Sequence, residues 1–338
     1  MPMTGTGALR QPAALRALPA EPLAAAIAPQ GDRATIAEIQ AGLLAPQAGT
    51  SPKYLYDSLG SRLFEAICEL PEYYPTRTEA AIFAIHGEDI ARRIGTGSTL
   101  IDLGAGNCAK AASLFPLLQP QQYVPIDISR DFLNEAVGRL RQRFPAIAMT
   151  ALALDLSGPF ELPAGVNTAR RQFFYPGSSI GNFAPHEAVA FLRRVRDNTY
   201  ADGGLLIGVD LVKDAAVLDA AYDDAIGVTA AFNLNMLRHL NHLTGSDFDV
   251  RQWQHVAFFN AAESRIEMHL EARTALTVCW PGGERRFARG ERIHTEDSYK
   301  YTPESFAAVL AQAGFTADAV WTDDAGWFAV MHARAAAD

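Results

Sequence analysis

Apolar residues recur every three or four positions in the first part of the chain that carries a clear pattern. This spacing predicts a helix over residues 33–44. Two more helices are expected over residues 57–70 and 76–94. The second of these has Thr76 as a candidate N-cap, with Glu79 three residues later. All three helices precede the first expected strand.

Short apolar runs then alternate with amphipathic stretches through the middle of the chain. The expected strands cover residues 99–103, 123–126, 148–154, 173–175 and 204–210. The expected helices between them cover residues 110–118, 130–144 and 186–197. Strands that alternate with helices in this way pair in parallel, with helices on both faces of the sheet. The pattern therefore predicts an α/β fold with a doubly wound, Rossmann-like sheet.

The end of the chain departs from this alternation. A helix is expected over residues 303–313, followed by apolar runs at 316–321 and 327–334. The run Asp323-Asp324-Ala325-Gly326 separates these two strands, and strands joined by so short a turn must pair antiparallel. We therefore expect a terminal antiparallel hairpin at the edge of the sheet.

A long segment between the fifth strand and this tail has a different pattern. Helices are expected around residues 217–243, and alternating runs occur near 256–259 and 264–272. We interpret it as part of a second, smaller α+β substrate-binding domain. The expected boundaries are a disordered Ala- and Pro-rich arm at 1–30, a substrate-binding domain at 31–77 and 213–299, and a cofactor-binding domain at 78–212 and 300–338.

Charge and cysteine content narrow the range of partners. The net charge of -9 argues against nucleic acid, which requires a basic face, and no apolar run approaches the length of a membrane helix. Three widely spaced cysteines are typical of a cytoplasmic protein. His239 and His242 lie three residues apart but lack an obvious third ligand, so no metal site is expected. We expect a monomer that acts on a small molecule.

Glycines and acidic residues gather where the first strands should end. Asp102 and the glycines Gly104 and Gly106 form a tight turn after the first strand, where backbone can approach a ligand closely. Asp127 closes the second strand, and a carboxylate there can accept both hydroxyls of an adenosine ribose. Asp155 closes the third strand and could accept the adenine amino group.

These acidic strand ends, with the terminal hairpin, are the arrangement of S-adenosylmethionine methyltransferases. Lys110, at the start of the following helix, completes the expected cofactor-binding set. A dinucleotide-binding turn would place a third glycine where this chain has Ala109. That substitution weakens the alternative of an NAD site without excluding it.

Several longer strings resemble one methyltransferase family from about Ser51 to the C-terminus. The chain is similar to the histidine-specific Nα-methyltransferases of ergothioneine biosynthesis, whose fungal relatives include tryptophan-derivative N-methyltransferases. The strings that carry the resemblance are Ser51-Pro52-Lys53 with Tyr56-Asp57, Leu70-Pro71-Glu72-Tyr73-Tyr74-Pro75-Thr76-Arg77, Ser179-Ile180-Gly181-Asn182, Asp210-Leu211-Val212-Lys213-Asp214, Ala221-Tyr222-Asp223-Asp224 and Arg265-Ile266-Glu267-Met268.

The resemblance implies roles for individual residues. Tyr56, Asn182 and Tyr222 would hold the carboxylate and the α-amino group of an amino acid, with Asn182 nearest the amine. Of these, Asn182 and Tyr56 would position the reacting nitrogen, while Tyr73 and Met268 would pack against or bond the substrate side chain. Phenol hydroxyls and a side-chain amide suit these tasks, since a phenol can donate to a carboxylate and an amide can both donate and accept.

The resemblance also implies that Glu296 and Ser298 bind an imidazole ring. If they lie on a strand, their spacing of two puts both on one face. A carboxylate and a hydroxyl can then bond the two ring nitrogens. The alternative is that Glu296 pairs at the surface with Lys300 or Arg292.

The resemblance implies Nα-methylation of L-histidine, up to the trimethylated betaine hercynine, with S-adenosylmethionine as cofactor. Two other hypotheses remain: methylation of another amino acid such as a tryptophan derivative, and a nonenzymatic cofactor-binding module. The run Gly177-Ser178-Ser179-Ile180-Gly181 formally matches a hydrolase elbow, but the helix that should follow at once is expected only after Pro185.

Overall fold

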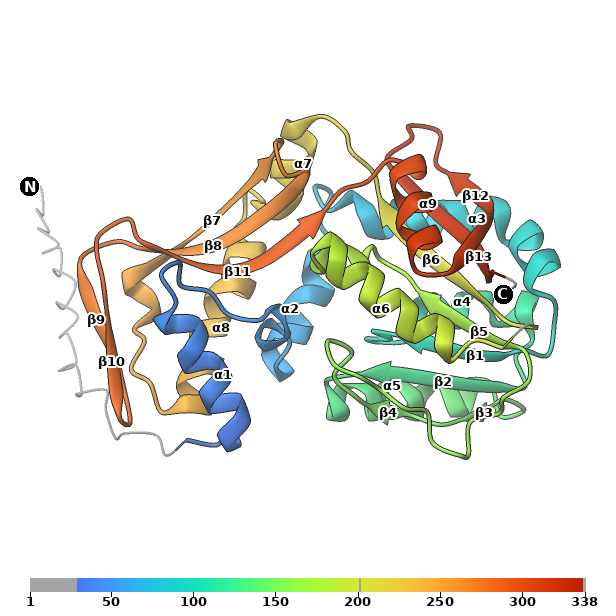
Figure 1. The fold of residues 1–338 in the computed structure, drawn as a ribbon, viewed down its shortest axis with the longest axis horizontal. Helices are drawn as coiled ribbons and strands as arrows, with labels where there is room; N and C mark the ends of the chain where they lie inside the picture. The colour runs from blue at the N-terminus through green and yellow to red at the C-terminus, as the bar shows by residue number, and fades with distance from the viewer. Residues whose placement is uncertain (1–28, 201, 337–338) are drawn as a thin grey trace, which may run out of the picture.

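The computed structural model describes residues 29–200 and 202–336, so all but the last two residues of the expected arm lie outside the described residues. Its main sheet confirms the predicted α/β class (Figure 1). The strands lie in the order β12-β13-β6-β5-β1-β2-β3, and β4 also pairs with β2. Their bounds are β1 Thr99–Leu103, β2 Gln122–Asp127, β3 Ala148–Met149, β4 Leu152–Ala153, β5 Arg171–Tyr175, β6 Gly204–Asp210, β12 Phe315–Thr322 and β13 Phe328–Ala335.

The strands from β6 to β3 pair in parallel, and the C-terminal hairpin adds the antiparallel edge that the sequence predicts. Strand β13 pairs antiparallel with both β6 and β12. Strand β1 pairs with β2 on one side and with β5, which comes later in the chain, on the other side. The strand order therefore reverses between β1 and β5, which is where ligands bind in open α/β sheets.

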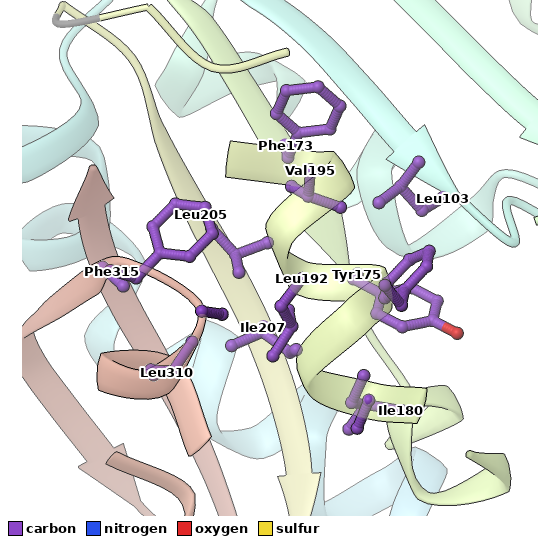
Figure 2. Close-up of a cluster of buried hydrophobic side chains, with 14 of the residues drawn as sticks. Leu103, Phe173, Tyr175, Ile180, Leu192, Val195, Leu205, Ile207, Leu310 and Phe315 are labelled. Carbon is purple, nitrogen blue, oxygen red and sulfur yellow. The ribbon is translucent and has the colours of Figure 1, made fainter. Parts of the chain in front are cut away.

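Helices cover both faces of this sheet, because the apolar side chains of each buried strand point alternately to one face and to the other. One face packs on α6 and α9 through residues such as Phe173, Leu205 and Phe315 (Figure 2). The opposite face packs on α3, α4 and α5 through residues such as Phe174 and Leu206. The helix bounds are α3 Tyr74–Ile94, α4 Ala109–Leu118, α5 Arg130–Arg143, α6 Pro185–Asp197 and α9 Pro303–Gln312.

A second group of elements surrounds a separate apolar cluster, on the left of Figure 1. It contains the three-stranded antiparallel sheet β11-β8-β7 and the hairpin β9-β10. The strand bounds are β7 Trp253–Asn260, β8 Arg265–Ala272, β9 Leu276–Trp280, β10 Gly283–Phe287 and β11 Arg292–Tyr299. The helices are α1 Arg33–Leu44, η1 Pro52–Leu55, α2 Ser58–Cys68, α7 Ala215–Tyr222, α8 Val228–Thr244 and η3 Val250–Gln252. The exact domain boundaries stay a prediction.

Three local expectations are wrong. The helix expected to begin at Thr76 begins at Tyr74, because Pro75 occupies its first turn, where proline is favoured. Thr76 is therefore not the N-cap, and Glu79 is buried instead of capping the helix. The expected strand at 148–154 is two short strands, β3 and β4, with Thr150 and Ala151 between them.

The hairpin β9-β10 was not expected, although Pro281 and Gly282 mark its turn and Gly282 has a φ of 89°. Among the described residues, every helix is too short or too polar to cross a lipid bilayer.

The two sheets are joined through the end of β11. Tyr301, just past this strand, pairs with Leu211 beyond the end of β6. Strand β11 also lies against η2 (Ser179–Asn182), the short 3-10 helix that follows β5. A Cβ atom on Gly181 would lie 2.8 Å from the backbone oxygen of Tyr299, so the close approach requires glycine.

Gly208, in the centre of β6, provides a test of the packing beneath the sheet. A Cβ atom there would lie 2.1 Å from Glu79 Oε1 and 3.0 Å from the Phe328 ring. We expect Gly208→Ala to lower the free energy of unfolding by roughly 1–3 kcal/mol, because a closely packed core resists added volume. Gly138→Ala is the matched control: this position in α5 has open space, so the variant should gain roughly 0.5–1 kcal/mol. Urea unfolding of both variants measures the difference, and equal effects would contradict it.

Candidate active site

A cavity of about 680 Å³ lies at the carboxyl ends of the parallel strands. Its walls come from the turns after β1, β2, β4 and β5, and from α2 and η1 on the opposite side. All six residues expected to bind the cofactor line it: Asp102, Gly104, Gly106, Lys110, Asp127 and Asp155.

The conformation of the glycine turn after β1 is fixed by two positive φ angles and by hydrogen bonds to Asp127. Gly104 and Gly106 have φ values of 66° and 52°, a region that favours glycine. The Gly106 amide donates to Asp127 Oδ2 at 2.9 Å, and the Ser129 amide donates to Oδ1 at 2.9 Å. Burial raises the pKa of Asp127 despite these amides. Asp127 therefore shapes the turn and also faces the cavity.

Asp102 has a free oxygen in this cavity. Tyr123 Oη donates to its Oδ2 at 2.6 Å, while Oδ1 is buried and has no hydrogen-bond partner among the described residues. Burial raises the pKa of Asp102 to about 7. An unpaired buried carboxylate oxygen is costly unless a donor or cation satisfies it. The residues present thus fit S-adenosylmethionine, which carries both an ammonium and a sulfonium.

Lys110 and Asp155 line the cavity but already have protein partners. Lys110 Nζ pairs with Glu79 Oε2 at 2.6 Å, and the Gly177 amide donates to the other oxygen of Glu79. Asp155 pairs with Lys53 Nζ at 3.2 Å and accepts from Ser157. Cofactor contacts for Lys110 and Asp155 therefore stay predictions.

Polar contacts close the cavity across its two walls. Arg62 on α2 pairs with Glu135 on α5 at 2.7 Å, and Asn107 Nδ2 donates to Glu65 Oε1 at 3.0 Å. Asn107 Oδ1 also accepts from the amide of Ala109, the first residue of α4. These exposed contacts hold α2 over the cofactor cavity.

A second, smaller cavity of about 50 Å³ adjoins the first. All seven residues expected to bind substrate line it: Tyr56, Tyr73, Asn182, Tyr222, Met268, Glu296 and Ser298. Tyr56, Tyr73 and Asn182 line both cavities. The smaller cavity is limited by itself, but these shared residues place it next to the larger one.

Glu296 and Ser298 both point into the smaller cavity from β11. A bulge follows His294, and beyond it residues 296 and 298 share the inward face. Asn182 Nδ2 donates to Glu296 Oε2 at 3.3 Å. Burial raises the pKa of Glu296 to about 8, and Lys300 opposes this increase.

The alternative of a surface ion pair for Glu296 does not hold. Arg292 pairs with Glu271, and Lys300 is buried and pairs with Asp210. Lys300 and Asp210 were not expected in the site. Lys300 continues the period of two from Glu296 and Ser298, and this spacing was the available signal.

The tyrosines of the smaller cavity are neutral donors. Burial raises the pKa of Tyr56 and of Tyr73 well above the ordinary value, so both keep their hydroxyl hydrogens at neutral pH. The Tyr56 ring packs edge-on against Phe64 and Phe232. The aromatic contacts hold Tyr56 at the junction of the two cavities.

The remaining candidate motifs have structural partners. Ser179, the central serine of the elbow-like run, begins η2 and donates to the Pro176 carbonyl at 3.2 Å. The helix α6 begins only at Pro185. His239 Nδ1 lies 2.8 Å from the Tyr54 carbonyl oxygen.

Asp102→Asn tests the cofactor cavity. The amide oxygen can still accept from Tyr123, but the negative charge is lost. We expect the dissociation constant for S-adenosylhomocysteine to rise about tenfold or more, because a buried charge-assisted contact is removed. Calorimetry measures it, with the exposed Asp131→Asn on α5 as control. Unchanged affinity in Asp102→Asn would show that this carboxylate does not contact the ligand.

Comparison with known proteins agrees with this geometry. The family model described as histidine-specific, S-adenosylmethionine-dependent methyltransferase matches residues 35–335. The histidine N-alpha-methyltransferase of Mycolicibacterium smegmatis is 40% identical, covering 86% of this chain and 92% of that protein. The enzyme of the same name from Mycobacterium tuberculosis is 38% identical over the same shares. Ergothioneine biosynthesis protein 1 of Neurospora crassa is 29% identical, covering 79% of this chain and 31% of that protein. The chain therefore belongs to the family of S-adenosylmethionine-dependent, histidine-specific methyltransferases.

Proposed function

We propose that this chain transfers methyl groups from S-adenosylmethionine to the α-amino nitrogen of L-histidine. The observation that carries the proposal is the shared cavity of Glu296, Ser298 and Asn182, directly beside the cofactor cavity. A carboxylate and a hydroxyl there can bond the two nitrogens of an imidazole, while the amide faces the reacting amine.

The cofactor cavity holds S-adenosylmethionine through residues of the first two strand ends. Asp102 offers its free oxygen to a cationic group, and Gly104 and Gly106 allow close backbone approach. Asp127 accepts from the ribose, and Lys110 and Asp155 complete the cavity. When bound, S-adenosylmethionine supplies a methyl group activated by its sulfonium.

The residues at the junction of the cavities orient the amine. Tyr56 and Asn182 line both cavities, so they can hold the nitrogen in line with the methyl carbon and the leaving sulfur. As the N–C bond forms, the C–S bond breaks. After the first and second transfers the nitrogen loses a proton to solvent, whereas the third leaves a quaternary nitrogen that has none to lose. The attacking amine must be uncharged, so the minor deprotonated fraction of the amino acid is the form that reacts.

The remaining contacts select the side chain. Tyr222 donates to the carboxylate, and Tyr73 and Met268 pack against the ring. A side chain without ring nitrogens, such as that of phenylalanine, would leave Glu296 and Ser298 unpaired, which such sites strongly disfavour. A tryptophan derivative is the alternative acceptor, but its indole has an N–H and no acceptor nitrogen.

The product of each transfer is still an amine until it carries three methyl groups. We therefore propose repeated transfer up to the trimethylated betaine hercynine, for ergothioneine biosynthesis. The likeness to the ergothioneine biosynthesis protein supports this role. We also propose that the chain acts as a cytoplasmic monomer, with substrate-binding and cofactor-binding domains at the boundaries predicted above.

The direct test is to incubate the purified chain with S-adenosylmethionine and either histidine or tryptophan, and to read added methyl groups by mass. Histidine should gain up to three. Methylation of tryptophan but not of histidine would show that tryptophan is the acceptor and would contradict the proposal. Failure to bind S-adenosylhomocysteine would favour the nonenzymatic alternative.

Glu296→Ala should lower kcat/KM for histidine by about 10- to 100-fold, because a buried ring N–H loses its acceptor. The dissociation constant for S-adenosylhomocysteine should change less than about twofold. Glu271→Ala is the matched control, since Glu271 lies on the neighbouring strand and pairs with Arg292. Equal losses of cofactor and histidine affinity in Glu296→Ala would contradict its assigned role.

Histidine binding should also depend on pH through Glu296. With a pKa of about 8, this carboxyl is mostly protonated at pH 6.5 and must lose its proton to accept the ring N–H. Affinity should therefore rise from pH 6.5 and level off above pH 8, an increase of roughly tenfold or more. Glu296→Gln removes this component, so the difference between the two calorimetric pH profiles isolates it. Parallel profiles would refute the prediction.

A further inference from the structure

Lys300 lies directly behind the residues that face the amino acid. It follows Glu296 and Ser298 at the same spacing of two, and its side chain is completely buried. Its ammonium contacts Asp210 Oδ2 at 2.8 Å, Ser298 Oγ at 2.8 Å and Tyr222 Oη at 3.0 Å. An ammonium has three hydrogens and no lone pair, so these three acceptors use all of its donors.

This arrangement determines what the two hydroxyls can do. Tyr222 and Ser298 each accept a hydrogen bond from Lys300, so each keeps its own hydrogen for another partner. Their oxygens lie 2.8 Å apart, and one of these hydrogens bridges them. The other must find an acceptor elsewhere, and both residues line the smaller cavity. A bound molecule that supplies two acceptors can take both hydrogens.

The ion cluster around Asp210 keeps Lys300 charged. Tyr74 Oη donates to Asp210 at 2.7 Å, and Lys213 Nζ lies 2.6 Å from its other oxygen. Burial is the largest single influence and opposes the charge on Lys300, but the contacts with Asp210 and Tyr222 together outweigh it, so the pKa of Lys300 is raised. The lysine therefore remains a donor at neutral pH and cannot accept from either hydroxyl.

We propose that Lys300 is a positioning residue that makes Ser298 and Tyr222 hydrogen-bond donors toward the amino acid, and so selects a ring with one acceptor nitrogen. This inference rests on the proposed function. Ser298 then donates to the bare nitrogen of a neutral imidazole, while Glu296 accepts from the ring N–H. An indole offers no acceptor to Ser298, so the same device disfavours tryptophan. Tyr222 keeps its hydrogen for the substrate carboxylate.

Lys213 supplies a matched control within the same cluster. It pairs with Asp210, as Lys300 does, and it contacts Tyr74 and the Leu211 carbonyl. No contact of Lys213 with Tyr222 or Ser298 occurs among the described residues. Lys213→Met therefore removes the same charge from the same carboxylate without touching the hydroxyl pair.

The experiment is a double-mutant cycle measured by calorimetry of histidine binding to the full chain saturated with S-adenosylhomocysteine. Its members are the unmodified chain, Ser298→Ala, Lys300→Met and the double variant, with Lys213→Met as control. We expect Lys300→Met to weaken histidine binding at least tenfold and Lys213→Met less than threefold. Ser298→Ala should cost about tenfold in the unmodified chain but less than threefold in the Lys300→Met background, because the serine is no longer held as a donor.

Additive effects of Lys300→Met and Ser298→Ala, or equal losses in Lys300→Met and Lys213→Met, would overturn the inference and leave a merely structural lysine. Binding of S-adenosylhomocysteine reports that each variant is folded. If Lys300→Met loses it, Lys300→Leu, which also has no donor, replaces it in the cycle with the same expectation of non-additive effects. A chain that binds S-adenosylhomocysteine but no histidine before any substitution would instead reject the proposed function.

Discussion

The close approach of β11 to η2 is the contact on which the active site depends. Strand β11 belongs to the antiparallel sheet, and η2 follows a strand of the parallel sheet. Because Gly181 has no side chain, the two backbones come close enough for Asn182 to reach Glu296. The residue that would hold the reacting amine and the residue that would hold the imidazole are thereby brought into one cavity. A change in this packing would separate the two halves of the substrate site.

Burial of polar groups is the second constraint. Asp102, Glu296 and Lys300 are all buried, and each is tolerable only because a partner is present or a ligand can supply one. Asp102 keeps one oxygen free in the cofactor cavity. The groups of the smaller cavity instead bond one another, as in the Tyr222–Ser298 pair. The cofactor cavity thus offers an unpaired acceptor to its ligand, whereas the residues of the substrate cavity must exchange internal hydrogen bonds for bonds to the substrate.

This difference suits an enzyme that must exclude water from the reaction. The cavity of about 680 Å³ can admit a large ligand, and the adjoining cavity of about 50 Å³ is small by itself. The contacts between α2 and the cofactor side, such as Arg62 with Glu135, are exposed ion pairs of small individual stability.

The sequence by itself determined the parallel sheet, the terminal hairpin and the acidic strand ends, because hydrophobic periodicity and glycine turns are local signals. The glycine turn and the strand ends predicted the six cofactor-site residues, and the resemblance to a family implied the seven substrate-site residues; all thirteen line the two cavities. The period of two from Glu296 and Ser298 was a local signal for Lys300, but only the tertiary structure revealed Asp210 as its buried partner, since the two residues are far apart in the sequence. The same holds for Glu79, whose expected capping role gave way to pairing with Lys110, 31 residues away. Contacts between residues distant in sequence decide which charges are buried, and local periodicity carries no information about them.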